Sequence, residues 1–338
     1  MSAAAATNGH AIRAFPPDRP PPFRPLPLIG HPHLQTLVAH FLPRRRFRYP
    51  DTRHPVRFPN GDVAIVHESQ PATRRPEAPT VILIHGMAGS HRSGYLARFA
   101  TRLLDLGIRV FRVDLPGCGE SLPLCRQPSH GGRTDDLRQI YLHLAALNPN
   151  DQFAVVGFSL GGNALLRLLA EVDRPLPRLV QAVAVNPPID MQRCCTLLEH
   201  RRNRLYERYF IYDLWQQARK RERAFPELKT PPFKELQRLR QFDDRYTAPV
   251  SGFRDAREYY AQASSLPHIE RIKTPTLLLT ARDDPFIDPA PFEGLPKKPN
   301  LIIDIASGGG HLGYLGHRNN GSIYWADERV LHYLLHGR

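Results

Sequence analysis

The sequence predicts an α/β protein: a mostly parallel, doubly wound sheet that carries a helical cap insertion. From residue 61 onward, short β-branched segments alternate with amphipathic ones, which is the pattern of strands connected by crossover helices. Several of the β-branched segments are apolar throughout, as expected for strands that helices cover on both faces. The alternation is interrupted once, between Pro187 and Pro267, where the sequence is charged and contains no convincing strand.

The spacing of apolar residues assigns the individual elements. Seven segments fit buried strands: Val63–His67, Val81–His85, Arg109–Val113, Phe153–Gly157, Val180–Val185, Thr276–Thr280 and Leu301–Ile305. Four segments place apolar residues at helical spacing: Tyr95–Leu106, Thr134–Leu147, Leu160–Val172 and Ile323–Leu335. The order of these segments predicts one sheet with helices on its two faces.

The same segments divide the chain into a core and two additions. We expect residues 28–187 and 268–338 to form the core. Residues 188–267 are expected to form a helical cap, or lid, because this insertion is too long for a simple loop. Twelve of the 34 prolines fall within the first 60 residues, which predicts an extended, poorly helical lead-in. Residues 1–27 are expected to be a flexible, proline-rich arm.

Length, charge and composition exclude several classes of protein. With 41% hydrophobic residues, the 338-residue chain can bury a core, and no apolar run reaches the roughly 20 residues that cross a bilayer. The net charge of +14 accompanies no helix-turn-helix, zinc-finger or RRM signature, so no nucleic-acid partner is expected. The N-terminus lacks an apolar signal-peptide centre, and we expect a cytoplasmic protein. The oligomeric state stays open.

The strongest functional signal is the motif Gly157-Phe158-Ser159-Leu160-Gly161. It lies between a predicted strand and a predicted helix, which is the context of the nucleophile elbow in the α/β-hydrolase fold. The tight turn would expose the Ser159 hydroxyl at the helix N-terminus, where free backbone N–H groups favour developing negative charge. We therefore expect Ser159 to be a catalytic nucleophile.

A serine nucleophile needs a base that a carboxylate orients, and in this fold the chain order is serine, acid, histidine. We expect the base to be His311, which lies among glycines after the strand Leu301–Ile305. The acid should follow the strand Thr276–Thr280, where Asp283 and Asp284 are adjacent. Asp284 is preferred because a hydrophobic residue follows it three positions later, as in the usual acid loop. Asp283 stays as the alternative, and otherwise caps the turn or binds loop amides.

Two backbone N–H groups are expected to form an oxyanion hole. One belongs to Leu160, the residue after the nucleophile. The other belongs to Met87, in the loop after the strand Val81–His85. His85 precedes Ser159 in the chain and is not expected to be the base. No residue pattern indicates a metal site or a cofactor, and ester cleavage on these residues requires neither.

Further segments occur in an order that resembles one family. They are His31-Pro32-His33-Leu34-Gln35-Thr36, Phe242-Asp243-Asp244, Tyr259-Tyr260, Asp283-Asp284-Pro285-Phe286 and Gly309-Gly310-His311-Leu312-Gly313. With the elbow, they resemble the YheT-like branch of the AB hydrolase superfamily, AB hydrolase family 4, from about residue 28 to the C-terminus. Family members often carry Leu-Glu where this chain has Met87-Ala88, which should alter the shape of the pocket more than the mechanism.

The resemblance implies a serine ester hydrolase with Ser159, Asp284 and His311 as its triad, and relatives that include carboxylesterases, monoacylglycerol lipases and phospholipases. The expected reaction is the hydrolysis of short- or medium-chain acyl esters or acylglycerols through an acyl-enzyme, with a small-molecule ester or lipid as partner. Two alternatives remain. One is an acyltransferase on the same triad, and the other is a non-catalytic binding protein on a hydrolase scaffold.

One surface of the insertion is a candidate for membrane contact. Sixteen basic and 11 acidic residues lie between residues 188 and 268. Several of the basic residues recur at spacings that can share a helix face, namely Arg201, Arg202, Arg204 and Arg208. Such a face is either an ordinary solvated surface or a peripheral docking site for an anionic membrane.

Overall fold

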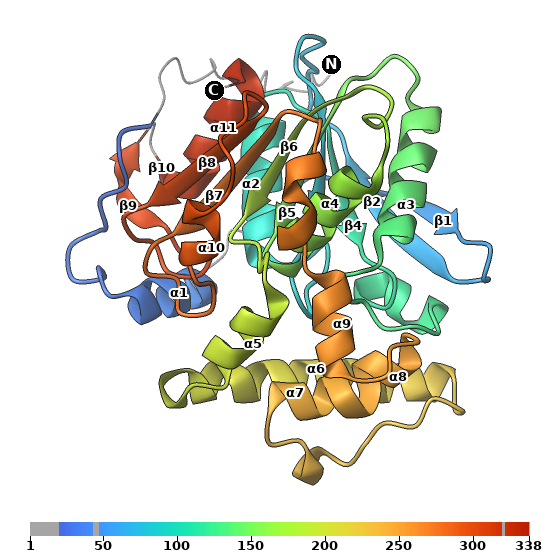
Figure 1. Cartoon of the computed structure of the whole chain (residues 1–338). Coiled ribbons are helices and arrows are strands. Elements are labelled where there is room, and N and C mark those ends of the chain that lie inside the picture. Colours follow the sequence, from blue (N-terminus) through green and yellow to red (C-terminus); the bar gives the residue numbers. More distant parts are fainter. Residues whose placement is uncertain (1–19, 43–46, 320–321, 338) are drawn as a thin grey trace, which may run out of the picture.

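A computed structural model of the chain describes residues 20–42, 47–319 and 322–337. Its main sheet has eight strands in the order β1-β2-β4-β3-β5-β6-β7-β8 (Figure 1). The strands from β4 to β8 in this order are parallel, whereas β2 is antiparallel to both β1 and β4. Their bounds are Thr52–Arg57 (β1), Val63–Ser69 (β2), Thr80–Ile84 (β3), Val110–Asp114 (β4), Phe153–Phe158 (β5), Leu179–Val185 (β6), Thr276–Ala281 (β7) and Leu301–Ala306 (β8).

Helices cover both faces of this sheet. The period-two geometry of a strand sends alternate side chains to opposite faces, so Ile82 and Ile84 of β3 join one core cluster and Val81 and Leu83 join the other. The first cluster includes α3, α4 and α10, and the second includes α2 and α11. These helices span Gly94–Asp105 (α2), Thr134–Leu147 (α3), Leu160–Glu171 (α4), Ala290–Glu293 (α10) and Trp325–His336 (α11). The predicted doubly wound α/β fold is confirmed, and each of the seven predicted strands is present.

The prediction of an extended, poorly helical lead-in is wrong for residues 32–41, which form a helix, whereas residues 52–57 are extended but belong to the main sheet. Helix α1 spans Pro32–Phe41 and strand β1 spans Thr52–Arg57. Proline at the first position of α1 breaks no hydrogen bond, because the first N–H groups of a helix have no intrahelical acceptor. Strand β1 lies at the edge of the sheet, where a proline such as Pro55 is tolerated. Proline content therefore misled the prediction.

The predicted N-terminal arm and the predicted C-terminal helix both differ from the structure. Residues 1–19 of the predicted arm lie outside the described residues. Residues 20–27 are packed rather than free: Phe23 is buried, and the amide of Leu26 donates to the carbonyl of Leu315 at 3.0 Å. The partner is part of a hairpin formed by β9 (Leu315–Asn319) and β10 (Ser322–Tyr324). The helix predicted at Ile323–Leu335 begins later than expected, at Trp325, because residues 322–324 form strand β10.

A helical insertion joins β6 to β7, as expected. It contains α5 (Met191–Leu198), α6 (Arg204–Ala224), α7 (Leu239–Phe242), α8 (Ala248–Val250) and α9 (Ala256–Ala263). In Figure 1 these helices lie beyond the carboxyl ends of the central strands. The limits drawn for the cap at residues 188 and 267 stay a prediction. No helix within the described ranges is long and apolar enough to span a bilayer.

Candidate active site

Ser159 occupies a strained turn between β5 and α4. Its φ of +50° lies in the left-handed region, and its amide donates to the carbonyl of Val185 at 2.8 Å. The turn also needs small neighbours, because a Cβ atom on Gly161 would lie 2.3 Å from the carbonyl oxygen of His85. This is the geometry of a nucleophile elbow, which fixes the Ser159 hydroxyl at the N-terminus of α4.

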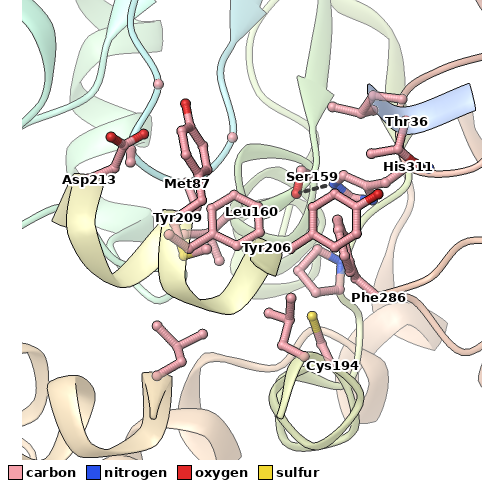
Figure 2. Close-up of a pocket in the computed structure, with 18 of the residues that line it drawn as sticks. Thr36, Met87, Ser159, Leu160, Cys194, Tyr206, Tyr209, Asp213, Phe286 and His311 are labelled. Atoms are coloured by element: carbon pink, nitrogen blue, oxygen red, sulfur yellow. Dashed lines mark hydrogen bonds between the residues drawn. The ribbon is translucent and has the colours of Figure 1, made fainter. Parts of the chain in front are cut away.

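The three residues predicted for a triad form one hydrogen-bonded chain. The Nε2 atom of His311 lies 3.0 Å from the Ser159 hydroxyl, and its Nδ1 atom lies 2.8 Å from Oδ2 of Asp284. Figure 2 shows the Ser159–His311 contact at the wall of a cavity. Asp284 and His311 follow β7 and β8, so the carboxyl ends of neighbouring parallel strands bring them to Ser159.

The structure distinguishes the two adjacent aspartates. Asp284 holds the imidazole through Oδ2, and its Oδ1 accepts the amide N–H groups of Phe286 at 2.8 Å and Ile287 at 3.1 Å. Asp283 instead accepts the amide of Gly310 at 2.9 Å and has no contact with the imidazole. Burial raises the pKa of Asp283. Asp284 therefore occupies the position of the orienting acid, and Asp283 holds the histidine loop.

Two residues around this chain were not identified from the sequence. The side-chain amide of Asn186 donates to Oδ2 of Asp284 at 2.6 Å, and the hydroxyl of Thr36 accepts the His311 amide at 2.9 Å. Asn186 had a usable signal, because it is the first polar residue after a strand of the same parallel sheet. Thr36 had none beyond its place in the family motif, because it comes from α1, which is remote in sequence.

Helix α1 supports the histidine loop directly. Gln35 is fully buried, and its Nε2 donates to the carbonyls of Ile29 at 2.8 Å and Leu315 at 2.9 Å. Its Oε1 accepts the amide of Leu315 at 2.7 Å. The approach is so close that a Cβ on Gly310, whose φ is +58°, would lie 2.4 Å from the carbonyl oxygen of Pro32. Only glycine fits at this point.

Two backbone N–H groups are free to face the site. Leu160 is the first residue of α4, so its N–H has no acceptor within the helix. Met87 lies in the Gly86–Gly89 turn, and within the described residues its N–H donates to no protein acceptor. Both residues line the same cavity as Ser159 (Figure 2). His85 is buried, and its ring nitrogens contact the carbonyl of Gly86 and the amide of Leu115, so it is part of the scaffold.

The cavity has a volume of about 650 Å³. Its walls come from the loop after β3, from α1, from the insertion and from the two loops that carry Asp284 and His311. Apolar and aromatic side chains dominate the lining; among them are Met87, Leu214, Tyr206, Tyr209 and Phe286. A concave, mostly apolar site with a few polar groups is the usual form of a small-molecule pocket.

Two carboxyl groups also line the cavity. Asp243 is buried and accepts a hydrogen bond from the hydroxyl of Tyr260 at 2.6 Å, and burial raises its pKa to about 6. Asp213, on α6, is partly buried, and burial raises its pKa as well. Both carboxyl groups therefore favour the neutral form more than an exposed aspartate does.

One cluster within the described residues has side chains that could ligate a metal: Asp51, His67 and His91. The side chains of this cluster contact charged groups of the protein itself. Asp51 pairs with Arg112, and Nδ1 of His91 lies 2.8 Å from Oδ2 of Asp114, which also contacts His67 at 3.3 Å. The cluster joins β2 and β4 to the loop after β3, and we assign it a structural role.

Comparison with known proteins identifies the family. The family model described as "Alpha/beta hydrolase family" matches residues 81–319. The chain belongs to the alpha/beta hydrolase family. This alpha/beta hydrolase is 30% identical over 315 residues to YheT of Escherichia coli, which is provisionally named an esterase, and the match covers 91% of each chain. The predicted resemblance to the YheT-like branch is thereby confirmed.

More distant similarities agree with this placement. The hydrolase is 28% identical to a monoacylglycerol lipase of Saccharomyces cerevisiae, over 73% of this chain and 57% of the yeast protein. Among solved structures, a 2,6-dihydroxy-pseudo-oxynicotine hydrolase matches with a TM-score of 0.58 and 18% identity, over 90% of this chain and 72% of that one. The structural match supports the fold.

Proposed function

We propose that the protein is a serine hydrolase that cleaves carboxylic esters through an acyl-enzyme. The observation that carries the proposal is the continuous hydrogen-bonded chain from Asp284 through His311 to Ser159, at the wall of an apolar cavity. A serine hydroxyl becomes an effective nucleophile only when a base held in the right orientation accepts its proton. The provisional esterase name of YheT and the lipase name of the yeast relative support an ester as substrate.

Each group has a definite part in the proposed reaction. Asp284 accepts a hydrogen bond from the Nδ1–H group of His311, which leaves the Nε2 lone pair directed at the Ser159 hydroxyl. Ser159 Oγ attacks the ester carbonyl while Nε2 takes its proton. The N–H groups of Met87 and Leu160 then stabilise the oxyanion. His311 returns the proton to the leaving alcohol, and water repeats the sequence on the acyl-enzyme.

The cavity indicates the class of ester. A volume of about 650 Å³ lies within the range of sites that enclose a small organic ligand, and its apolar walls suit a hydrocarbon chain. We therefore propose short- or medium-chain acyl esters or acylglycerols as substrates. The polar groups of Asp213 and Asp243 would limit where the polar end of such a substrate can lie.

Labelling with a fluorophosphonate tests the reactive serine. The probe should form a covalent adduct on Ser159 of the wild-type protein and none on Ser159→Ala, whose far-UV circular dichroism should be unchanged. A panel of p-nitrophenyl and glycerol esters of increasing chain length then measures substrate preference. Ester hydrolysis that persists in Ser159→Ala would contradict the proposal.

Acyl transfer uses the same groups and differs only in whether water or an alcohol attacks the acyl-enzyme. The two are separated by adding ethanol or glycerol to a turning-over reaction and measuring the ratio of new ester to free acid. A non-catalytic binding protein is disfavoured because it has no need of the strained φ of +50° at Ser159 or of its contact with His311. Failure of the fluorophosphonate to react would favour that alternative.

A further inference from the structure

The exposed residues of the cavity lining locate its mouth. The lining includes residues from seven segments of the chain, but its exposed members are confined to two places. They lie on α1 and at the start of α6 with the turn before it: Leu37, His40, Phe41, Arg202, Leu205 and Tyr209. The two helices are in contact, because the rings of His40 and Tyr209 lie 5.8 Å apart and the hydroxyl of Tyr206 lies 3.2 Å from Nδ1 of His33. The cavity therefore opens between α1 and α6.

Large apolar side chains are exposed on the two helices that border this mouth. We call them the apolar rim: Leu34, Leu37, Phe41, Leu205, Tyr209 and Tyr212. The three on α1 are spaced i, i+3, i+7 and the three on α6 are spaced i, i+4, i+7, so each set shares one helix face. Phe41 is 74% exposed and Leu205 is 86% exposed. A cluster of large exposed apolar residues around a pocket is typical of a surface that contacts another apolar phase.

Basic residues without acidic partners adjoin the rim. Arg201, Arg202 and Arg204 are exposed, and among the residues that the structure describes none of the three has a carboxylate within ion-pair distance. Helix α1 contains no acidic residue, and Glu207, the first acid of α6, is buried and paired with Arg238. By contrast, Arg219 and Arg245 of the same insertion each pair with a glutamate. The three arginines thus place unpaired positive charge beside the mouth.

We propose that the apolar rim and these three arginines dock the cavity mouth on an anionic lipid bilayer. Apolar side chains would enter the boundary between headgroups and acyl chains, and the arginines would contact lipid phosphates, which is the arrangement of an amphipathic membrane-surface helix. The charge complementarity selects an anionic lipid over a neutral one. Docking on the bilayer does not depend on catalysis. Its expected benefit is that lipid esters enter the cavity directly from the bilayer, and this benefit rests on the proposed ester hydrolysis.

Vesicle binding tests the docking separately from the reaction. The full chain carrying Ser159→Ala is sedimented with sucrose-loaded vesicles of diether phosphatidylcholine, with or without about one third diether phosphatidylglycerol, at low and high salt. Binding should require phosphatidylglycerol and weaken at high salt. Two charges near an anionic surface contribute about 1 kcal/mol each, so Arg201→Glu with Arg204→Glu should lower binding by about thirtyfold or more. Phe41→Glu with Leu205→Glu should also lower it strongly.

Helix α3 offers a matched control. Arg138 is exposed there with no carboxylate partner among the described residues, and Leu147 is 50% exposed. Arg138→Glu with Leu147→Glu should bind vesicles like the parent. With Ser159 restored, Arg201→Glu with Arg204→Glu should retain the rate on a soluble short-chain ester and lose rate on a vesicle-borne one.

Three results would overturn the docking proposal. The first is equal binding to neutral and anionic vesicles, or no binding to either. The second is unchanged binding of the Arg201→Glu, Arg204→Glu protein. The third is a dimer in sedimentation velocity that Phe41→Glu with Leu205→Glu dissociates, because the rim would then be covered by a second copy. If vesicles bind as expected but no ester is cleaved, the docking stands and the proposed hydrolysis fails.

Discussion

Asp283 and Asp284, the neighbouring carboxylates after β7, bind different groups: Asp284 binds the His311 imidazole and Asp283 binds the Gly310 amide. Single substitutions can test this difference. Asp284→Asn should lower kcat by on the order of 10⁴-fold, as the equivalent change does in serine proteases, because an amide donor in this position favours the wrong imidazole tautomer. Asp283→Asn should retain most of the turnover and lower the free energy of unfolding, because its contact is the Gly310 amide. Steady-state kinetics and denaturant unfolding of both variants give the comparison.

The pair of variants acts as its own control, since the substitutions are identical and adjacent. A large loss of kcat in Asp283→Asn with little loss in Asp284→Asn would assign the orienting role to Asp283. Equal losses in both would show that the histidine loop, and not the imidazole contact, limits turnover.

Asp243 gives a prediction about pH. Burial raises its pKa to about 6, above the value near 3.9 of an unfolded aspartate, so the folded state binds the proton more tightly. The contribution of Asp243 to stability is therefore fully present below about pH 4 and is lost as pH rises to about 6, by on the order of 2 to 3 kcal/mol. The free energy of unfolding of Asp243→Asn relative to the wild type should rise over this interval, as measured by urea denaturation.

The control for this prediction is Asp244→Asn, at the adjacent position, whose carboxylate accepts the amide of Ala256. Its difference from the wild type should not follow the same rise between pH 4 and pH 6. A constant difference between Asp243→Asn and the wild type across this interval would show that Asp243 does not bind its proton more tightly in the folded protein.

Single residues also show how far the sequence alone can lead. The elbow motif and the chain order of the fold point to Ser159, Asp284 and His311, because each follows a strand that apolar periodicity predicts. The hydrophobic residue three positions after Asp284 favoured it over Asp283 from the sequence, and the structure adds the contact of each carboxylate. Thr36 could not be found, because its contact with the His311 amide joins residues 275 positions apart.

At the scale of elements, α1 is a support of the site as well as a surface helix. Gln35→Ala would remove three hydrogen bonds and leave the Ile29 carbonyl and the Leu315 amide without their Gln35 partner, while the Leu315 carbonyl still accepts the Leu26 amide. We expect a loss on the order of 2 kcal/mol in the free energy of unfolding, since each of these two buried unsatisfied groups costs about 1 kcal/mol or more. We also expect a lower kcat, because α1 holds the His311 amide through Thr36.

The matched change is Gln262→Ala on α9, where the glutamine is exposed and its side chain donates to Glu258 at 3.0 Å. It should alter stability by less than about 0.5 kcal/mol. Urea unfolding of both variants, with kcat measured at the same temperature, makes the comparison. Equal stability of Gln35→Ala and the wild type would mean that α1 is not anchored through this side chain.

Elements differ in how well the sequence predicts them, and packing explains the difference. Strands β3, β5 and β7 are buried on both faces, so their sequences are continuously apolar and were identified. Strand β1 is mostly exposed and α1 begins at a proline, so neither carries that signal. Both owe their existence to tertiary partners, β1 to pairing with β2 and α1 to the histidine loop.

At the scale of the whole molecule, the parallel sheet gathers the site and the insertion covers it. The strands β5, β6, β7 and β8 are neighbours, and their carboxyl ends carry Ser159, Asn186, Asp284 and His311 in that order. This arrangement follows from the order of strands, which single-sequence periodicity does not determine. The insertion supplies much of the cavity wall, and α6 is fastened to the loop of Met87 by a hydrogen bond of 2.9 Å from Gln217 to the carbonyl of Ala88.

The central claim is that an ester passes its acyl group to Ser159, and intact-protein mass spectrometry after rapid acid quench tests it most directly. During turnover of a p-nitrophenyl ester, the wild type should carry an added mass equal to the acyl group, located on the peptide that contains Ser159, and the adduct should decay when substrate is exhausted. Ser159→Ala should carry none. An adduct on another residue, or ester cleavage by Ser159→Ala at the wild-type rate, would contradict the account.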